Sequence, residues 1–382
     1  MTRPSPDGKG SPLAMVLAGG AARGAYEAGV LRYLYHDLPR RLGYLPWPDI
    51  VAGASVGALN SSFVAGRDPD GLLWLSQVYK TLQLPDVFSV SYTDVFRTLR
   101  DAFRDAPFFI ADPEPLQKMA FRHFPKRQIR RAVQEGLTWI VGATDLRTGF
   151  QVLFVDSETA PDWELRPGVN VVHTEIRSIH TLASAALPLL FPPIQVGDRL
   201  LVDGGLRMNT PLRPVIRAGA ERIIVLSLRR PFQDEERTLQ VPNLPFLVGK
   251  TINALWLDPI EQDLHDAEQV NRIIEWGTEH YGPGFAAKFQ RDIGQREVDV
   301  LFIAPSVDLG EVAASIYADR PPRVSGALSS LMGWAGGETG PDADLLSYVY
   351  FDKEYTGTLE ELGYRDAQAL EEEIVKLVAP DE

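Results

Sequence analysis

Apolar and polar residues follow a regular order through the first 65 residues of the chain. Residues 13–18 and 49–52 form two short apolar runs, and a turn of small residues follows each run. Between the runs, apolar side chains recur from residue 30 to residue 38 at the spacing of one helix face. A second helix is expected after the second turn, through residues 59–64. The order strand–helix–strand–helix is typical of a parallel sheet with crossover helices.

The rest of the chain continues this α/β pattern. Residues 68–135 are mostly helical in pattern, with prolines as breaks, and the sequence beyond residue 230 is again mostly helical. We expect a disordered N-terminus at residues 1–12, one catalytic α/β domain at residues 13–230, and a mainly helical extension at residues 231–382 packed on that domain. The further elements expected are strands at residues 137–143, 151–155, 222–228 and 298–304, a helix at residues 176–186, and a hairpin at residues 195–202 that turns at Gly197-Asp198.

Composition narrows the class of protein. The 382 residues are 45% hydrophobic and 23% charged, which is enough for a substantial core. The formal net charge of −13 argues against nucleic-acid binding, because that requires a basic surface. The absence of cysteine excludes disulfides, thiolate metal ligands and thiol catalysis. No run approaches the roughly 20 apolar residues that span a bilayer, so we expect no transmembrane segment. The expected protein is cytoplasmic, and its contact with a lipid interface is at most transient.

The turn after residue 52 carries the first candidate for catalysis, Gly53-Ala54-Ser55-Val56-Gly57. Gly-x-Ser-x-Gly between a strand and a helix is the pattern of a nucleophile elbow, in which small residues permit a sharp turn. The turn presents the serine at a helix N-terminus, whose dipole favours a developing negative charge. The alternative is an ordinary strand-to-helix turn in which Ser55 is only the N-cap residue.

The turn after residue 18 is the second candidate, Gly19-Gly20-Ala21-Ala22-Arg23-Gly24. Backbone N–H groups in such a turn can bind a phosphate or stabilise the oxyanion of a tetrahedral intermediate. A dinucleotide site requires Gly-x-Gly-x-x-Gly and an acidic residue about 20 positions later. Here Ala21 replaces the middle glycine, and Asp37 is too near and lies in a helix tail. Nucleotide binding is therefore the weaker interpretation of this turn.

The third candidate is Asp203-Gly204-Gly205, which follows the second strand of the expected hairpin. Asp203 is either a turn residue or a carboxylate base aimed into a cleft. The loop after it contains Asn209 and Pro211.

A serine nucleophile needs a base, and histidine is the usual one. None of the six histidines lies in a context that suggests a triad base; they are His36, His123, His173, His180, His265 and His280. The order Ser55, Asp203 and then His265 or His280 matches that of an α/β-hydrolase. Such enzymes, however, place the serine after several strands, whereas only about two precede it here. The glycine-rich turn and Asp203 fit a two-residue catalytic machine better.

Two further clusters lie between residues 100 and 135. The aromatic residues Phe103, Phe108, Phe109, Phe121 and Phe124 favour core packing, with the wall or lid of an acyl pocket as the alternative. The basic residues Arg122, Lys126, Arg127, Arg130 and Arg131 favour a solvated helix face, with contact to lipid headgroups as the alternative.

Four segments, in this order, resemble motifs of the patatin-like phospholipase family. Residues 17–26 resemble its glycine-rich oxyanion loop, and residues 53–60 resemble its nucleophile elbow. Residues 183–193 resemble the helix-to-loop segment that precedes the catalytic aspartate, and residues 201–211 resemble the Asp-Gly-Gly segment. The resemblance covers residues 13 to about 228, whereas the C-terminal part carries no such motif.

The resemblance implies a three-layer α/β/α fold with a mostly parallel central sheet, and a Ser–Asp dyad without histidine. Ser55 would attack the ester carbonyl, and Asp203 would be the general base for this attack and for hydrolysis of the acyl-enzyme. Amides around Gly19, Gly20 and Ala21 would hold the oxyanion, and Arg23 would brace the loop or meet a headgroup phosphate. The glycines implied to shape the three turns are Gly24, Gly53, Gly57, Gly204 and Gly205.

The family more often has a third glycine where this chain has Ala21. If that position requires a positive φ, the alanine side chain costs on the order of 1 kcal/mol. The implied activity is hydrolysis of lipid acyl esters, of the phospholipase A or lysophospholipase type, with no cofactor and no metal. The alternatives are an esterase or thioesterase for other substrates, and a catalytically silent scaffold that binds lipid or nucleotide.

Overall fold

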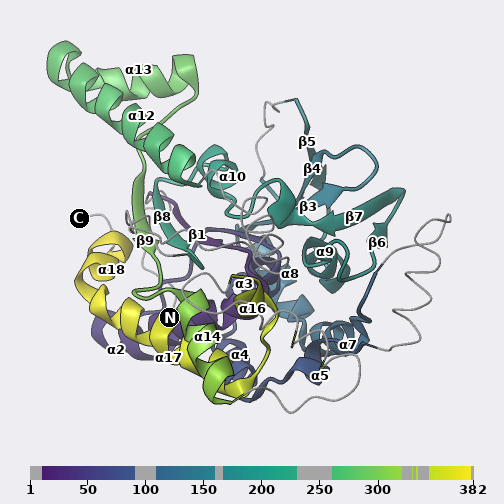
Figure 1. Cartoon of the computed structure of the whole chain (residues 1–382). Helices are drawn as coiled ribbons and strands as arrows, with labels where there is room; N and C mark the ends of the chain where they lie inside the picture. Colours follow the sequence, from purple (N-terminus) through teal and green to yellow (C-terminus); the bar gives the residue numbers. More distant parts are fainter. Residues whose placement is uncertain are drawn as a thin grey trace, which may run out of the picture.

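The computed structural model of the chain describes residues 11–90, 109–159, 167–229, 260–320 and 344–379, together with residues 329 and 333. A nine-stranded, mostly parallel sheet lies at the centre, and helices cover both of its faces (Figure 1). The α/β class and the three layers expected from the sequence are confirmed.

Seven strands follow one another across the sheet in the order β5-β4-β3-β2-β1-β8-β9, while β7 pairs with β3 and β6 pairs with β7. The pairs from β3 through β2, β1 and β8 to β9 are parallel, whereas β4 and β7 are antiparallel to β3. The strands are β1 (Leu13–Leu17), β2 (Ile50–Ala54), β3 (Thr138–Asp145), β4 (Gln151–Asp156), β5 (Val169–His173), β6 (Ile194–Val196), β7 (Arg199–Asp203), β8 (Arg222–Leu226) and β9 (Asp299–Ile303).

Every strand expected from the pattern is present, and β5 is an additional one. The pattern does not predict β5 because it is a five-residue edge strand with no buried position, so its apolar signal is weak. The late strand β9 joins the same sheet, in parallel with β8. The part of the chain beyond residue 230 therefore contributes to the central sheet as well as covering it, and the division at residue 230 stays a prediction.

Alternate residues of the strands pack on opposite faces of the sheet. Leu13, Met15 and Leu17 of β1 belong to the core cluster on one face, whereas Ala14 and Val16 belong to the cluster on the other face. Both faces are covered, which explains why the strands are continuous apolar runs instead of alternating apolar and polar residues.

The helices expected in the first 65 residues are α1 (Gly24–Arg32) and α3 (Val56–Ala65), and α1 continues through a π-helical segment η2 (Tyr33–Asp37) into α2 (Leu38–Leu42). The expected helix before the hairpin is α9 (Ser178–Ser184), shorter than predicted. The remaining helices are α4 (Pro69–Thr81), α5 (Leu84–Val87), α7 (Glu114–His123), α8 (Lys126–Gln134), α10 (Leu212–Arg217), α12 (Ile260–Tyr281), α13 (Gly284–Ile293), α14 (Leu309–Asp319), α16 (Asp344–Val349), α17 (Lys353–Ala369) and α18 (Glu371–Val378), with short 3-10 turns η1 (Ala21–Arg23) and η3 (Gly204–Leu206).

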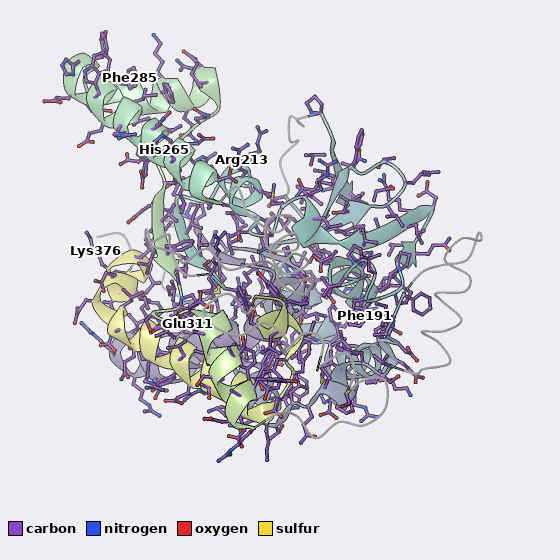
Figure 2. The ribbon with its side chains drawn as sticks, in the orientation of Figure 1. Phe191, Arg213, His265, Phe285, Glu311 and Lys376 are labelled. Atoms are coloured by element: carbon purple, nitrogen blue, oxygen red, sulfur yellow. The ribbon has the colours of Figure 1, made fainter. Side chains whose placement is uncertain are left out.

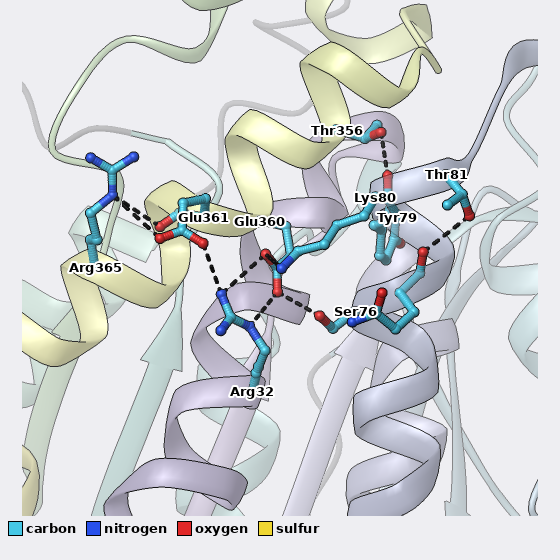
Figure 3. Close-up of polar contacts among 10 residues, drawn as sticks. Arg32, Ser76, Tyr79, Lys80, Thr81, Thr356, Glu360, Glu361 and Arg365 are labelled. Atoms are coloured by element: carbon cyan, nitrogen blue, oxygen red, sulfur yellow. Dashed lines mark hydrogen bonds and ion pairs between the residues drawn. The ribbon is translucent and has the colours of Figure 1, made fainter.

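Helix α17 packs tightly on α1 and α4. A Cβ on Gly29 would lie 1.8 Å from the Glu360 carbonyl oxygen, so only glycine permits the close approach of α1 and α17. At this crossing the buried Glu360 carboxylate binds Arg32 at 2.6 Å and Lys80 at 2.9 Å, and the Ser76 hydroxyl donates to it at 2.6 Å (Figure 3). A buried carboxylate with two cations and a hydroxyl is fully compensated, and the cluster holds three helices together.

Helices α12 and α13 form a hairpin that projects away from the rest of the molecule (Figure 1). Aromatic rings contact one another along it: Trp276 packs edge-on against Tyr281, and Tyr281, Phe285 and Phe289 stack in turn. Phe285 lies on this projecting hairpin (Figure 2).

Several expectations concern residues outside the described part of the chain. Residues 1–10 of the predicted disordered N-terminus lie outside the described residues, whereas Ser11 and Pro12 are described. Phe103 and Phe108 of the aromatic cluster also lie outside the described residues. Within the described residues, no helix combines the length and the apolar character needed to cross a bilayer.

Candidate active site

The three candidate segments meet at one edge of the sheet. The glycine-rich turn follows β1 and the Ser55 turn follows β2, and these neighbouring strands are parallel, so both turns lie at the carboxyl edge. Asp203 ends β7, where it lies opposite Ala143 in the antiparallel pairing with β3. The carboxyl edge of a mostly parallel sheet is where open α/β folds bind their ligands.

Ser55 has the strained backbone of a nucleophile elbow. Its φ of 52° and ψ of −127° are rare for a residue with a side chain and cost on the order of 1–3 kcal/mol. A Cβ on Gly53 would lie 2.4 Å from the Gly57 carbonyl oxygen, and a Cβ on Gly57 would lie 2.4 Å from the Leu17 carbonyl oxygen. Both glycines of the motif are therefore required by close backbone contacts, as the pattern predicts.

Ser184 holds this elbow from behind. The Ser55 amide donates to the Ser184 hydroxyl at 2.9 Å, and the Ser184 hydroxyl donates to the Gly142 carbonyl of β3. Ser184 is fully buried at the end of α9. The backbone of Ser55 is thus tied to the neighbouring strand, although its own amide is then occupied.

Asp203 lies beside the Ser55 side chain. The Ser55 hydroxyl donates to Asp203 Oδ2 at 2.6 Å, and the Gly205 amide donates to Asp203 Oδ1 at 2.7 Å. The carboxyl group is 0% exposed, and none of the described residues forms an ion pair with it. Burial raises the pKa of Asp203 to about 7, although the two hydrogen bonds oppose the rise. A carboxyl group with this pKa can accept and return a proton near neutral pH.

The Asp-Gly-Gly turn packs directly on β3. A Cβ on Gly204 would lie 2.2 Å from the Gly142 carbonyl oxygen, and the Thr144 hydroxyl donates to the Asp203 carbonyl oxygen at 2.9 Å. The glycine after Asp203 therefore permits the close contact that brings the carboxylate to Ser55.

The glycine-rich turn is fastened to the loop after Asp203. The Gly19 amide donates to the Asn209 carbonyl at 3.1 Å, and the Asn209 side chain donates to the Gly19 carbonyl at 3.0 Å. The Gly19 amide is therefore already paired. In the described part of the chain, the Gly20 and Ala21 amides have no acceptor outside their own short helix, which leaves these two donors for a ligand.

Ala21 has a φ of 48°, the conformation in which its side chain is unfavourable. The strain predicted for this departure from the family pattern is therefore present. Ala21 keeps its backbone N–H and lines the same pocket as Ser55.

Arg23 is buried, with 5% of its surface exposed. Its Nε and Nη2 atoms donate to the Ser347 hydroxyl at 2.8 and 2.6 Å, and its guanidinium lies 4.1 Å from the centre of the Tyr348 ring. Of the two roles considered for Arg23, these contacts favour bracing the loop. The next residue, Gly24, permits close contact with Val56, because a Cβ there would lie 2.4 Å from Val56 Cγ2.

A buried polar network supports the turn from below. Asn60 donates to the Gly24 carbonyl at 3.1 Å and to Glu27 at 2.8 Å, and it accepts from the Tyr79 hydroxyl at 3.2 Å. Burial raises the pKa of Glu27 well above its ordinary value, although the hydrogen bond from Asn60 opposes the rise. The network ties α1, α3 and α4 together beneath the loop.

No histidine hydrogen-bonds Ser55 or Asp203 in the described part of the chain. His265 and His280 lie on α12, away from the sheet edge, and His265 is on the projecting hairpin in Figure 2. His180 packs on Phe154, and burial lowers its pKa to about 4. His123 stacks on Trp74 and lines the same pocket as Ser55.

An apolar pocket of about 970 Å³, counting the space at its open mouth, begins at Ser55. Helices α3, α4 and α7, the end of α9 and the segment that includes α16 line it, with side chains such as Phe63, Trp74, Met119 and Phe191. The pocket suits a hydrocarbon chain, because nearly all its lining atoms are apolar.

The structure places the described members of the aromatic and basic clusters between residues 100 and 135 in different surroundings. Phe124 lines the pocket and packs against the core, whereas Phe121 is 58% exposed on α7. The basic side chains from Arg122 to Arg131 are exposed, as expected for a solvated helix face.

Comparison with known proteins identifies the family of this chain. The chain matches the patatin-like phospholipase family over residues 15–216, more than half of its length, and it belongs to that family. Relatives described as uncharacterized NTE family proteins, from Mycobacterium bovis and Mycobacterium tuberculosis, are 29% identical over 256 residues, which is 64% of this chain. The matched part spans 58% of the length of those relatives.

Solved structures with low sequence similarity were also found. VipD from Legionella pneumophila is 12% identical with a TM-score of 0.39, covering 96% of this chain and 67% of that chain. Human GIVD cytosolic phospholipase A2 is 14% identical with a TM-score of 0.43, covering 96% of this chain and 60% of that chain.

Sequence reasoning named Ser55, Asp203 and the glycine-rich turn, and the structure brings all three together. It did not single out Ser184 or Asn209. Ser184 lies within the segment that resembles the family's helix-to-loop motif, and Asn209 lies within the Asp-Gly-Gly segment, six residues after Asp203. Their places in these two motifs are the sequence signal that could have identified them. The contacts of Arg23 with Ser347 and Tyr348 had no signal in the sequence.

Proposed function

We propose that the protein is a serine acyl-ester hydrolase of lipids, of the phospholipase A or lysophospholipase type, with Ser55 as nucleophile and Asp203 as general base. The observation that carries this proposal is the 2.6 Å hydrogen bond between the two side chains, one of which, Ser55, lines an apolar pocket. Membership of the patatin-like phospholipase family supports the same reaction class.

The first half of the reaction forms an acyl-enzyme. Asp203 accepts the proton of the Ser55 hydroxyl as its oxygen attacks the ester carbonyl. The amides of Gly20 and Ala21, for which the described residues offer no acceptor outside their own short helix, stabilise the oxyanion of the tetrahedral intermediate. The intermediate then expels the alcohol part of the lipid, which leaves with the proton from Asp203.

The second half releases the fatty acid. Asp203 accepts a proton from a water molecule that attacks the acyl-enzyme carbonyl, and the same amides hold the new oxyanion. When this intermediate breaks down, Ser55 recovers its proton from Asp203 and the carboxylic acid leaves. A pKa of about 7 suits this exchange, since Asp203 must be a base in one step and an acid in the next.

The pocket indicates what the acyl part of the substrate is. Its apolar walls stabilise a hydrocarbon chain by about 25 cal/mol per Å² of apolar surface removed from water. A charged or strongly polar acyl group would lose its hydration there without new hydrogen bonds. The preferred substrates are therefore esters of long-chain fatty acids.

Covalent labelling tests the proposal. A fluorophosphonate probe should react with the wild-type protein, and mass spectrometry should find the adduct on Ser55. Ser76→Ala is a matched control, because Ser76 is also a buried serine whose hydroxyl donates to a carboxylate at 2.6 Å. We expect the label to disappear in Ser55→Ala and to persist in Ser76→Ala. Equal labelling of wild type and Ser55→Ala would contradict the proposal and favour a silent lipid-binding scaffold.

A further inference from the structure

Helix α16 lies against the glycine-rich turn, although more than 300 residues separate them in the chain. Its Ser347 is completely buried, and the Ser347 hydroxyl accepts two hydrogen bonds from the Arg23 guanidinium, at 2.8 and 2.6 Å. The next residue, Tyr348, places its ring 4.1 Å from the same guanidinium. Arg23 is the last residue of the short helix that contains Ala21, so its position is directly coupled to that of the turn.

The same segment also forms a wall of the apolar pocket. Tyr348 and Phe351 both line the pocket together with Ser55 and Ala21. Phe351 packs edge-on against Phe88, with ring centres 6.3 Å apart, and Phe88 packs in the same way against Phe191 on another wall. The segment therefore touches both the oxyanion turn and the space for the substrate.

Helix α17 holds this segment in place. The Tyr355 hydroxyl donates to the Ser347 carbonyl at 3.3 Å, and the Tyr355 ring stacks on Tyr350 with centres 5.4 Å apart. Thr356 donates to the Tyr79 carbonyl of α4, and the Glu360 cluster fastens α17 to α1 and α4. A group held by packing and hydrogen bonds on rigid helices can position a catalytic loop to within fractions of an ångström.

We infer that residues 344–351 complete the active site from the C-terminal part of the chain. Ser347 and Tyr348 are positioning residues that hold the oxyanion turn through Arg23, and Tyr348 with Phe351 determines which acyl chains fit the pocket. The ligand of this composite site is the hydrocarbon chain of a lipid ester. This inference rests on the proposed hydrolase function.

Chain-length selectivity tests the role of the pocket wall. A series of p-nitrophenyl esters with acyl chains of four to twelve carbons, all assayed in the same detergent, is compared by kcat/KM. In Phe351→Ala the ratio of long-chain to short-chain kcat/KM should change by about tenfold, since one misfitted methylene or cavity in an apolar pocket changes discrimination by roughly that factor. Phe351→Leu, which keeps more of the side-chain volume, should change the ratio less.

Two tyrosines provide a matched pair for the role of Tyr348. Tyr364 of α17 stacks on Arg32 at 3.9 Å, much as Tyr348 stacks on Arg23 at 4.1 Å, but it does not line the pocket. Tyr348→Leu should alter both the chain-length ratio and kcat, whereas Tyr364→Leu should leave the ratio at the wild-type value. Equal ratios in both variants would contradict the assignment of Tyr348 to the site.

Ser347→Ala tests the positioning of the turn. It should lower kcat about tenfold with little change in KM or in the chain-length ratio, because a displaced oxyanion turn weakens binding of the transition state more than that of the substrate. Ser76→Ala removes another buried hydroxyl bonded to a charged group and should leave kcat near the wild-type value. A purely structural role of Ser347 would lower the melting temperature of Ser347→Ala while kcat per folded molecule stayed unchanged, and this result would overturn the inference.

The failure of this inference can be distinguished from failure of the proposed function. If Ser55→Ala retains full activity, the hydrolase proposal itself is wrong. If Ser55→Ala is inactive while the Phe351, Tyr348 and Ser347 variants keep the wild-type kcat and chain-length ratio, only the inference about α16 is wrong.

Discussion

The described part of the chain contains two buried serine–carboxylate pairs with hydrogen bonds of the same length. Ser55 donates to Asp203 at 2.6 Å, and Ser76 donates to Glu360 at 2.6 Å. Both carboxylates are 0% exposed. Their surroundings differ, because Glu360 binds Arg32 and Lys80, whereas Asp203 has no ion-pair partner among the described residues.

The difference separates a structural pair from a chemical one. Glu360 forms ion pairs with two cations, and these contacts hold α1, α4 and α17 together. Asp203 has only the Ser55 hydroxyl and the Gly205 amide, so its charge is costly, its pKa is raised to about 7, and it can take up a proton. Asp203 is also hydrogen-bonded to Ser55, which lines the apolar pocket and has a strained backbone. A serine–carboxylate hydrogen bond of the same length is therefore structural where cations surround the carboxylate and suited to proton transfer where the described residues place no cation beside it.

The largest difference between the pairs should appear in activity. Asp203→Asn should lower kcat about 10³- to 10⁴-fold on a lipid ester, since the amide cannot accept the Ser55 proton. Glu360→Gln, the equivalent change at the other pair, should leave kcat of the folded protein within about threefold, because it lies outside the pocket. Similar losses in both variants would show that the comparison has no catalytic meaning.

The pH dependence of catalysis should follow Asp203 alone. The base form is the carboxylate, so kcat/KM should fall about tenfold for each pH unit below about 7 and level off above it. The same profile measured on Glu360→Gln should keep its midpoint. A wild-type profile that is flat between pH 5 and 8 would argue against Asp203 as the base.

Replacing the carboxylate of each pair by an amide should change the free energy of unfolding in opposite directions. The folded pKa of Asp203 is above its ordinary value of 3.8, so the native state binds more protons between about pH 4 and 7 and loses stability as pH rises through this window. Asp203→Asn should therefore raise the free energy of unfolding at pH 8, by an upper bound of about 4 kcal/mol, and by less at pH 5.

Glu360→Gln should instead lower the free energy of unfolding by on the order of 2 kcal/mol, because Lys80 loses its ion pair with Glu360 and Arg32 is left with its ion pair with Glu361. Chemical denaturation of both variants at pH 5 and pH 8 checks both signs. A stability loss in Asp203→Asn at pH 8 would mean that its hydrogen bonds outweigh the burial of its charge.

The smallest effect is expected at the strained position of the oxyanion turn. Ala21→Gly relieves about 1 kcal/mol of strain at a φ of 48° but gives the unfolded chain more freedom, so the two nearly cancel. We expect a change in unfolding free energy below about 0.5 kcal/mol and kcat within about twofold of wild type. A tenfold change in kcat would show that the alanine side chain itself shapes the oxyanion site.

Local features of the site could be predicted because each of them has a local cause. Gly53 and Gly57 follow from the sharp turn around Ser55, and the strands before the turns follow from their apolar runs. The edge strand β5 and the contacts of Ser184 could not be predicted in this way, because the first is half-exposed and the second depends on a strand distant in sequence. The aromatic pattern favours core packing, with the wall of an acyl pocket as the alternative, and it does not distinguish one phenylalanine from another. Among the described members of the cluster, only Phe124 lines the pocket.

Periodicity and backbone sterics act over a few residues, so the amino-acid sequence predicted most of the strands and helices and the two small-residue turns. The candidate dyad followed from the resemblance of four segments to the patatin-like phospholipase family. The surroundings of Ser55 depend on the tertiary structure. The pairing of β7 with β3 brings in Asp203 from 148 positions away, and burial there raises the pKa of its carboxyl group. The fold of the C-terminal helices brings Ser347 to Arg23 across 324 positions. Charge, burial and distance at a site depend on contacts between remote segments, and these exist only once the chain has folded.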